Sequence, residues 1–230
     1  MSLAYVGVKG GMVIVSADDP GPISSQTEQD TRRFADFCRI PVFDPSSPEE
    51  AYKMIGDAFE YSEKYNTPVL FRPTTRVCHA YASIDNCDSP SPKKYEGFVK
   101  DSKKWVIFPR LSFANHIMIE KRNVEIGKDF STYSANKAEG VNSEKAVVTS
   151  GISYAYTKEC LKDYPDVKLI KIATAYPFPE DFVLSSLEGA KEVLCIEELS
   201  PFIEEQILKL AGKHGLQLKV SGKLDGKVQA

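Results

Sequence analysis

The feature that most constrains the fold of this chain is the alternation of short apolar runs with helix-length amphipathic segments. MVIVSA at residues 12–17 and PVLFR at residues 68–72 are apolar enough to be buried strands and far too short to cross a membrane. Two helical patterns and a further short apolar run lie between them. A strand–helix–strand–helix–strand order is typical of a parallel sheet. The first third of the chain is therefore predicted to be α/β.

The clearest helical pattern is SPEEAYKMIGDAFEYSEKY, which starts at Ser47. Ser47 is suited to cap the helix, Pro48 to occupy its first turn and Glu50 to complete a capping box. One face of this helix carries small and apolar side chains, namely Ala51, Met54, Ile55, Ala58 and Ser62. This face is expected to cover the sheet.

The last third of the chain repeats the same logic. KAVVTSG, VKLIKIA, KEVLCIEE and LQLKV are predicted to be parallel, buried strands. Helices are expected near residues 152–163, 179–188 and 201–213, the last of them capped by Ser200 and ended by Gly215. The chain is thus predicted to hold two parallel-sheet α/β domains, at residues 1–78 and 145–230. Residues 79–144 are interpreted as a linker and an excursion, because KKWVIFPRLSFANHIMIEKRNVEI shows no sustained apolar repeat at helix spacing.

Composition limits the classes of partner. Among 230 residues, 29 Lys and Arg face 32 Asp and Glu, and the net charge of -3 gives no reason to expect a nucleic acid or membrane partner. The five cysteines form no C-x-x-C pair, which argues against a zinc or iron–sulfur site and favours a reducing compartment. No signal-peptide pattern is present. We expect a cytoplasmic protein whose partner is a small molecule or another protein.

The first polar cluster, in VIVSADDPGPISSQTEQDTRRF, follows a predicted strand directly. In open parallel sheets the carboxyl ends of strands are where ligands bind. The simpler interpretation is that Ser25 and Glu28 form a capping box and that Asp18–Pro22 is a turn. The remaining polar residues would then be a solvated helix start, and spacing alone favours this interpretation: Ser24, Gln26, Gln29, Asp30, Arg32 and Arg33.

The second polar cluster is FRPTTRVCHA at residues 71–80. Its arginines and threonines could bind a carboxylate or phosphate. Alternatively, Arg72 and Arg76 alternate outward on an extended segment and His79 only begins a loop.

Two smaller features leave the same kind of choice open. The TSG sequence at residues 149–151 has the composition of an anion site but is a weak signal. Glu197 and Glu198 could be paired carboxylates for acid–base chemistry, although a strand end is the favoured interpretation.

Several ordered blocks of sequence carry a family resemblance. GGMVIVSADDPGPISSQTEQDTRRFADFCRIPVFDPSSPEEAYKM and TPVLFRPTTRVCHA resemble the alpha subunits of indolepyruvate:ferredoxin oxidoreductases, within the thiamine-diphosphate-dependent 2-oxoacid:ferredoxin oxidoreductase superfamily. VVTSGISYAY, KIATAYPFPEDFV, EVLCIEELSPFIEEQI and GKLDG resemble the next domain of the same subunit. The similarity covers nearly the whole chain.

The resemblance implies oxidative decarboxylation of an aryl 2-oxoacid, indolepyruvate, with coenzyme A, giving an acyl-CoA, carbon dioxide and reduced ferredoxin. It implies thiamine diphosphate, Mg²⁺ and [4Fe-4S] clusters in the full-length enzyme. The implied partners are the beta subunit, ferredoxin, the 2-oxoacid and coenzyme A, and a homodimer is a further arrangement that it allows. By the same resemblance, the first domain is a partial pyrimidine-binding domain and the second is like the transketolase C-terminal domain.

The resemblance also implies a set of cleft residues. The family's D-D-P-x-x-x-S-S-Q-x-E-Q-D loop falls on Asp18, Asp19, Pro20, Ser24, Ser25, Gln26, Glu28, Gln29 and Asp30, and its T-T-R block falls on Thr74, Thr75 and Arg76. The residues expected to line a substrate or cofactor cleft are Ser24, Ser25, Gln26, Gln29, Thr74, Thr75 and Arg76. The motif identifies no catalytic residue, and no metal site is expected.

The chain departs from the family pattern at several points. Ile23 stands where the family usually has a histidine, which leaves the choice of 2-oxoacid open. The chain has no G-D-G…N segment for magnesium diphosphate and no cysteine-rich tail, and the glutamate that activates the cofactor is expected upstream of MSLAYVG. We therefore expect an internal fragment that by itself binds no cofactor and is inactive. The alternatives are a non-catalytic α/β binding or scaffolding module, or the same reaction on another 2-oxoacid.

Overall fold

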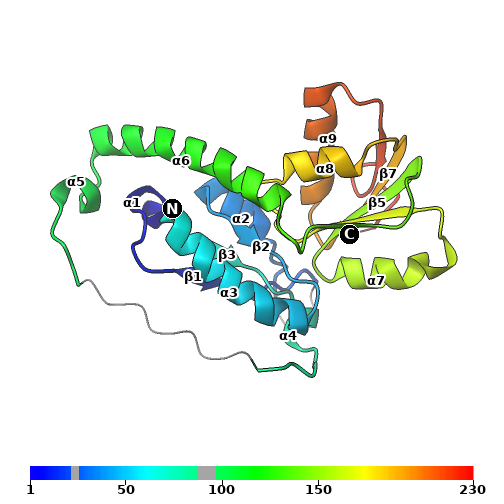
Figure 1. Cartoon of the computed structure of the whole chain (residues 1–230), viewed down its shortest axis with the longest axis horizontal. Helices are drawn as coiled ribbons and strands as arrows, with labels where there is room; N and C mark the ends of the chain where they lie inside the picture. Colours follow the sequence, from blue (N-terminus) through cyan, green and yellow to red (C-terminus); the bar gives the residue numbers. More distant parts are fainter. Residues whose placement is uncertain (22–25, 87–96, 230) are drawn as a thin grey trace.

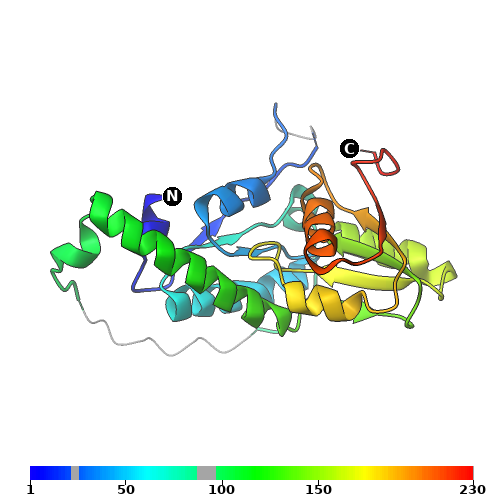
Figure 2. The same cartoon turned by 90° about the horizontal axis from the view of Figure 1, so that it is seen from above.

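The computed structural model describes residues 1–21, 26–86 and 97–229 (Figures 1 and 2). The first sheet has the order β1-β3-β2, and both pairings are parallel. Its strands are β1 (Val13–Val15), β2 (Val42–Phe43) and β3 (Val69–Phe71). They alternate with α2 (Thr31–Cys38) and α3 (Pro48–Tyr65), so the predicted parallel α/β arrangement of this part of the chain is confirmed. The predicted burial of the first strand is wrong, because β1 lies at the edge of the described sheet and Val15 is 61% exposed.

The second sheet has the order β4-β6-β5-β7-β8. The four strands that the sequence predicts are all parallel, as expected: β5 (Lys145–Ser150), β6 (Lys168–Ile172), β7 (Glu192–Ile196) and β8 (Lys219–Ser221). The strand β4 (Lys137–Glu139) is antiparallel to β6 and was not predicted, because its three residues are mostly exposed and polar. The intervening helices are α7 (Ser153–Cys160) with the 3-10 turn η1 (Leu161–Asp163), α8 (Glu180–Ser186) and α9 (Phe202–His214).

The predicted ends of α3 and α9 are largely confirmed. The Ser47 hydroxyl accepts a hydrogen bond from the Glu50 backbone N–H at 3.2 Å, as a helix cap should. The Glu50 carboxylate instead accepts from the Ser46 backbone N–H at 2.7 Å. In α9 the N-cap is Pro201, so Ser200 was placed one position early, whereas Gly215 ends the helix at φ 64° as predicted.

The predicted start of α2 at Ser25 is wrong. The helix begins at Thr31, and the Asp30 carboxylate caps it by accepting from the Arg32 backbone N–H at 3.3 Å. Residues 26–30 form no helical turn. Gln29 donates its backbone N–H to the Asp19 carbonyl at 3.0 Å and holds this stretch against the preceding loop. Ser25 itself lies outside the described residues.

The middle of the chain contains a long helix that the sequence interpretation missed. After α5 (Ser102–Trp105), α6 runs for 23 residues over Pro109–Ser131. Only a narrow stripe of α6 is buried, at Ile119, Asn123, Ile126 and Phe130. Other apolar residues of α6 are exposed on either side of this stripe, so no clean amphipathic repeat is visible.

Two buried hydrophobic clusters each contain residues from both the first and the last part of the chain, and α6 contributes Ile126 and Phe130 to one of them. Figure 1 shows α6 running from α5 toward α8, and α6 contacts both α1 (Ser2–Val6) and α8. The Val42 backbone N–H donates to the Tyr176 carbonyl at 2.7 Å, which places the segment after β6 beside the outer edge of β2. A domain boundary near Lys145 remains a proposal, and the shared clusters predict that the two parts stabilise one another.

No described helix is both long enough and apolar enough to span a bilayer.

Candidate functional site

Charged side chains gather where the carboxyl ends of the two sheets meet. Asp18 follows β1, Asp44 follows β2, Arg72 follows β3 and Glu197 follows β7. All four are at most 4% exposed. Charges at such positions are expensive to bury unless they are paired, and here each acid contacts an arginine.

Arg72 is the centre of the first group of these contacts. Its Nε donates to Asp18 Oδ2 at 2.7 Å, and its Nη1 lies 3.4 Å from both carboxylate oxygens of Asp44. The outward orientation considered for Arg72 is thus wrong, because β3 is the central strand of its sheet and its end is enclosed. Burial raises the pKa of Asp44, although Arg72 and Arg32 oppose the shift.

Arg32 connects the loop before α2 to the end of β7. It binds both Asp30 oxygens, through Nε at 2.8 Å and Nη2 at 2.7 Å, and its Nη1 donates to Glu197 Oε2 at 2.7 Å. Glu197 also accepts the backbone N–H groups of Ile203 and Glu204 at the start of α9. Burial by itself would raise the pKa of Asp30, but the hydrogen bonds and charge of Arg32 lower it to about 2.

This network was not predicted from the sequence, where Asp30 and Arg32 were interpreted as a solvated helix start. The available signal was that Asp44 and Arg72, like Glu197, stand directly after strands too apolar to be exposed. The favoured description of Glu197 as a strand end is correct for its position, but its carboxylate is also a buried partner of Arg32.

A cavity of about 350 Å³ opens beside the network, between the first and the last third of the chain. Thr75 and Arg76, in the short helix α4 (Thr75–Cys78), line it on one side, and Tyr156 of α7 and Glu198 line it on the other. The exposed Arg76 guanidinium lies 5.9 Å from the centroid of the Tyr156 ring. An accessible arginine of this kind is suited to bind a carboxylate or phosphate.

The other predicted cleft residues have different positions. Thr74 is fully buried, Gln26 and Gln29 are exposed, and none of the three is among the residues that line the cavity. Ser24 and Ser25, together with Ile23, lie outside the described residues. Thr75 Oγ1 donates to the Asp18 carbonyl at 3.1 Å and to the Asp19 carboxylate, so the two predicted polar clusters meet at the same sheet edge.

Glu198 and Thr74 carry buried polar atoms that lie close to each other but form no hydrogen bond of good geometry. Glu198 Oε2 and Thr74 Oγ1 are inaccessible to solvent and lack a hydrogen-bond partner within the described part of the chain. Burial raises the pKa of Glu198, while the charge of Arg72 and the neighbouring Thr74 hydroxyl oppose the shift. A carboxyl group of this kind beside a cavity is a candidate for proton transfer or for binding a donor on a ligand.

The TSG sequence contributes close packing to this region. Gly151 has φ 52°, and a Cβ atom there would lie 3.0 Å from Asp44 Oδ1. Glycine is thus required both for the backbone angle and for the approach of the Asp44 carboxylate.

We expect Glu198→Gln to stabilise the isolated chain by on the order of 1 kcal/mol at pH 7 to 8. A carboxyl group whose pKa is raised in the folded state costs stability as the pH rises from its unfolded to its folded pKa, and the full cost is present above the folded value. The advantage of the amide should therefore shrink as the pH falls toward 4, where the unfolded carboxyl is itself protonated.

Urea unfolding of both proteins between pH 4 and pH 8 measures this difference. The exposed Glu188→Gln is the matched control and should show no comparable pH-dependent gain. A loss of stability in Glu198→Gln at pH 8 would mean that the ionised carboxylate has a partner after all.

Comparison with solved structures defines the class of fold. A 2-oxoglutarate:ferredoxin oxidoreductase from Magnetococcus marinus, solved with 2-oxoglutarate, coenzyme A and succinyl-CoA bound, matches 96% of this chain and 46% of its own, with a TM-score of 0.63 at 16% identity. A split-gene transketolase, described as an inactive beta4 tetramer, matches 91% of this chain and 56% of its own, with a TM-score of 0.55 at 13% identity. The fold is thus of the α/β class that these enzymes share.

Sequence comparison identifies the family. The indolepyruvate oxidoreductase subunit IorA of Methanothermobacter thermautotrophicus is 38% identical over 230 residues, and that of Thermococcus kodakarensis is 38% identical over 231 residues. These alignments cover 98% and 97% of this chain but only 37% and 36% of the relatives. No family model matches the sequence. The chain belongs to the IorA family and spans little more than a third of the length of these relatives.

Proposed function

We propose that this chain is part of an enzyme that oxidatively decarboxylates an aryl 2-oxoacid, indolepyruvate, with coenzyme A and passes the electrons to ferredoxin. The names of the relatives support this class of reaction. The observation on this chain that carries the proposal is the cavity at the carboxyl ends of both sheets, with an accessible arginine and a half-buried carboxyl group on its walls.

Each wall residue has a role that follows from its chemistry. Arg76 presents a guanidinium to the carboxylate of the 2-oxoacid, and Tyr156 beside it offers an aromatic surface. Glu198 supplies a carboxyl group that burial makes easier to protonate. The Arg32 and Arg72 networks hold the strand ends that carry these residues, so they position the cavity walls without contacting the substrate.

The described residues fit only part of the cofactor that the family uses. Enzymes of this family depend on thiamine diphosphate, whose diphosphate is held through a magnesium ion with oxygen ligands. No group of three or more His, Cys, Asp or Glu side chains suited to a metal occurs in residues 1–21, 26–86 and 97–229. The acids at the sheet edge are instead held by Arg32 and Arg72.

The proposal extends to the assembly. Segments outside this chain, and a beta subunit, would supply the diphosphate and magnesium site, the [4Fe-4S] clusters and the contact with ferredoxin. A homodimer of the complete assembly and a cytoplasmic location are part of the same proposal.

The test is to tag the chain in its native cells, purify the complex that carries it and measure 2-oxoacid-dependent reduction of a viologen dye with coenzyme A. We expect turnover with indolepyruvate, and Arg76→Ala should raise the KM for the 2-oxoacid about 10- to 100-fold, as for loss of one charge-assisted contact. The KM of Arg76→Lys should lie between those of the wild type and Arg76→Ala, because lysine keeps the positive charge but cannot form the paired hydrogen bonds of a guanidinium group.

The matched control is Arg110→Ala, which removes an exposed arginine at the start of α6 and should leave the KM unchanged. A complex that turns over no 2-oxoacid would favour the non-catalytic module. Unchanged kinetics in Arg76→Ala would remove the cavity from the proposal and leave the family reaction in place.

A further inference from the structure

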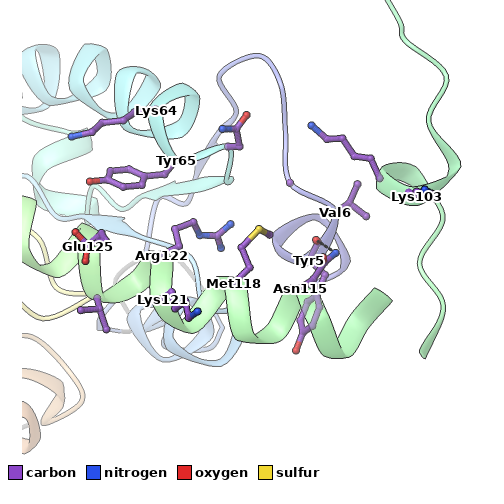
Figure 3. A pocket seen from close by; sticks show the side chains of 14 residues that line it. Tyr5, Val6, Lys64, Tyr65, Lys103, Asn115, Met118, Lys121, Arg122 and Glu125 are labelled. Atoms are coloured by element: carbon purple, nitrogen blue, oxygen red, sulfur yellow. Dashed lines mark hydrogen bonds between the residues drawn. The ribbon is translucent and has the colours of Figure 1, made fainter. Parts of the chain in front are cut away.

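A second and larger pocket lies at the other end of the first sheet, beside the residues that precede β1 and β3. It occupies about 930 Å³ between α1, α5, α6 and the end of α3. Figure 3 shows Arg122, Met118 and Lys121 on α6 below the pocket, Tyr65 and Lys64 above it, and Lys103 at its far side. Because it is remote from the carboxyl edge of the sheets, it is not part of the site described above.

Arg122 is the unusual residue of this pocket. Within the described part of the chain, its Nε and Nη2 atoms are inaccessible to solvent and have no hydrogen-bond partner, and no carboxylate forms an ion pair with it. Burial lowers the pKa of Arg122 to about 10, so the guanidinium stays charged at neutral pH. A largely buried cation without a counter-anion is costly, and a bound anion would offset that cost.

The pocket holds further positive charge that the rest of the wall does not neutralise. Lys103, Lys104 and Lys121 form no ion pair within the described part of the chain. The one acid on the wall, Glu125, lies 3.1 Å from Lys128 outside the pocket. The local excess of positive charge contrasts with the net charge of -3 for the whole chain.

The remaining wall is apolar and aromatic. Val6, Met118 and Val124 contribute aliphatic surface, and Tyr5 and Tyr65 contribute rings. The Tyr65 hydroxyl is occupied by Asp129 at 2.5 Å, so its ring, and not its hydroxyl, is what the residue can offer a ligand. The volume lies near the upper end of the range of about 300–1,000 Å³ that small-molecule sites occupy.

We propose that this pocket binds a nucleoside polyphosphate, with the phosphates beside Arg122 and the three lysines and the base against the apolar wall. Four uncompensated cations suit a polyphosphate better than a single carboxylate, which would neutralise only one of them. The volume likewise exceeds what an aryl acid would fill, and the aromatic wall suits a planar base. The proposal does not depend on the 2-oxoacid chemistry of the other site.

Calorimetric titration of the 230-residue chain with ATP, inorganic triphosphate and adenosine tests it. We expect ATP to bind most tightly, triphosphate about tenfold more weakly because it lacks the base, and adenosine more weakly still because it lacks the charge. Arg122→Met should weaken ATP binding at least about tenfold. It should keep the fold, since methionine fills a similar space without a buried charge.

Arg110→Met, on the same helix but outside the pocket, is the control and should bind ATP as the wild type does. Lys121→Gln changes an exposed residue, so it gives a second variant that is safe for folding and should weaken binding by a smaller factor. Absence of ATP binding at millimolar concentration would overturn the proposal. Equal affinity for ATP and triphosphate, or undiminished binding by both pocket variants, would overturn it as well.

Discussion

Replacing Arg32 with methionine is expected to destabilise the folded chain by about 3–5 kcal/mol, the range for removing one partner of a buried ion pair. Asp30 and Glu197 are almost inaccessible to solvent, and the substitution removes the nearest positive charge from both. Arg32 also donates to the carbonyls of Glu198 and Ser200, so the loop after β7 loses two further contacts. Chemical denaturation at pH 7 measures the difference.

The neighbouring Arg33→Met is the matched control. Arg33 pairs with Glu205, and the two side chains are 43% and 40% exposed. Exposed pairs contribute about 0–1 kcal/mol, so this variant should remain close to the wild type. Equal losses of stability in Arg32→Met and Arg33→Met would contradict the conclusion that the buried ion pairs of Arg32 stabilise the fold.

A second variant tests whether the effect acts through Glu197. In the double variant Arg32→Met and Glu197→Gln, no charge remains on the Glu197 side of the contact, so part of the lost stability should return. The two substitutions should therefore be non-additive, as for residues in direct contact. Strict additivity would indicate that Arg32 stabilises the chain mainly through Asp30 and the carbonyl groups.

The parallel strands could be predicted because each is a short apolar run bounded by polar residues. The strands β5 and β6 are buried along most of their length, so no alternation of polar residues obscures them. The cap of α3 was predictable because Ser47, Pro48 and the apolar face of that helix agree on one register. Local signals and tertiary packing point the same way in these elements.

The start of α2 could not be predicted because a tertiary contact overrides the local one. Asp18, at the end of β1, accepts hydrogen bonds from the Thr31 backbone N–H at 2.7 Å and from its hydroxyl at 2.9 Å. This contact fixes Thr31, six residues after the predicted start at Ser25, as the first residue of the helix. Capping signals are local, and this one is formed across thirteen residues.

The helix α6 was missed for a related reason. Its buried stripe packs on two separate surfaces, because Phe130 joins the aromatic cluster around Phe43 while Asn123 donates to the Tyr176 hydroxyl at 3.2 Å. Phe113 and Val124 on its other sides are 73% and 58% exposed. A sequence pattern shows only which residues are apolar, and it cannot distinguish buried from exposed apolar residues.

The cleft residues could be predicted only in part, because some of them follow from the family resemblance and others only from tertiary packing. Thr75 and Arg76 line the cavity, as the family resemblance implied and residue spacing alone did not favour, and Pro20 and Gly21 line it beside them. Glu198 and Tyr156 come from more than 70 residues further along the chain, and only the packing of the two sheets brings them to the same cavity. Their participation could not be inferred from local patterns.

The isolated 230-residue chain is expected to show no 2-oxoacid-dependent reduction of a viologen dye, even with thiamine diphosphate, Mg²⁺, coenzyme A and indolepyruvate present. The described residues line part of a cavity, and they contain no group of three or more His, Cys, Asp or Glu side chains that could hold a metal ion. Catalysis by positioning fails when part of the site is absent, because the reacting groups are then not held together. The native complex, assayed in parallel, should be active.

Titration with thiamine diphosphate separates this expectation from the nucleotide pocket. The cofactor carries a diphosphate, so weak binding could occur at Arg122 without any link to catalysis. Such binding should be independent of Mg²⁺ and should be weakened by Arg122→Met, whereas binding at a cofactor site would require Mg²⁺ and be unaffected by that change. Magnesium-dependent micromolar binding would show that this chain contains a cofactor site. Turnover by the isolated chain would show that it contains a complete active site. Either result would contradict the expectation, because neither can arise from the cavity walls alone.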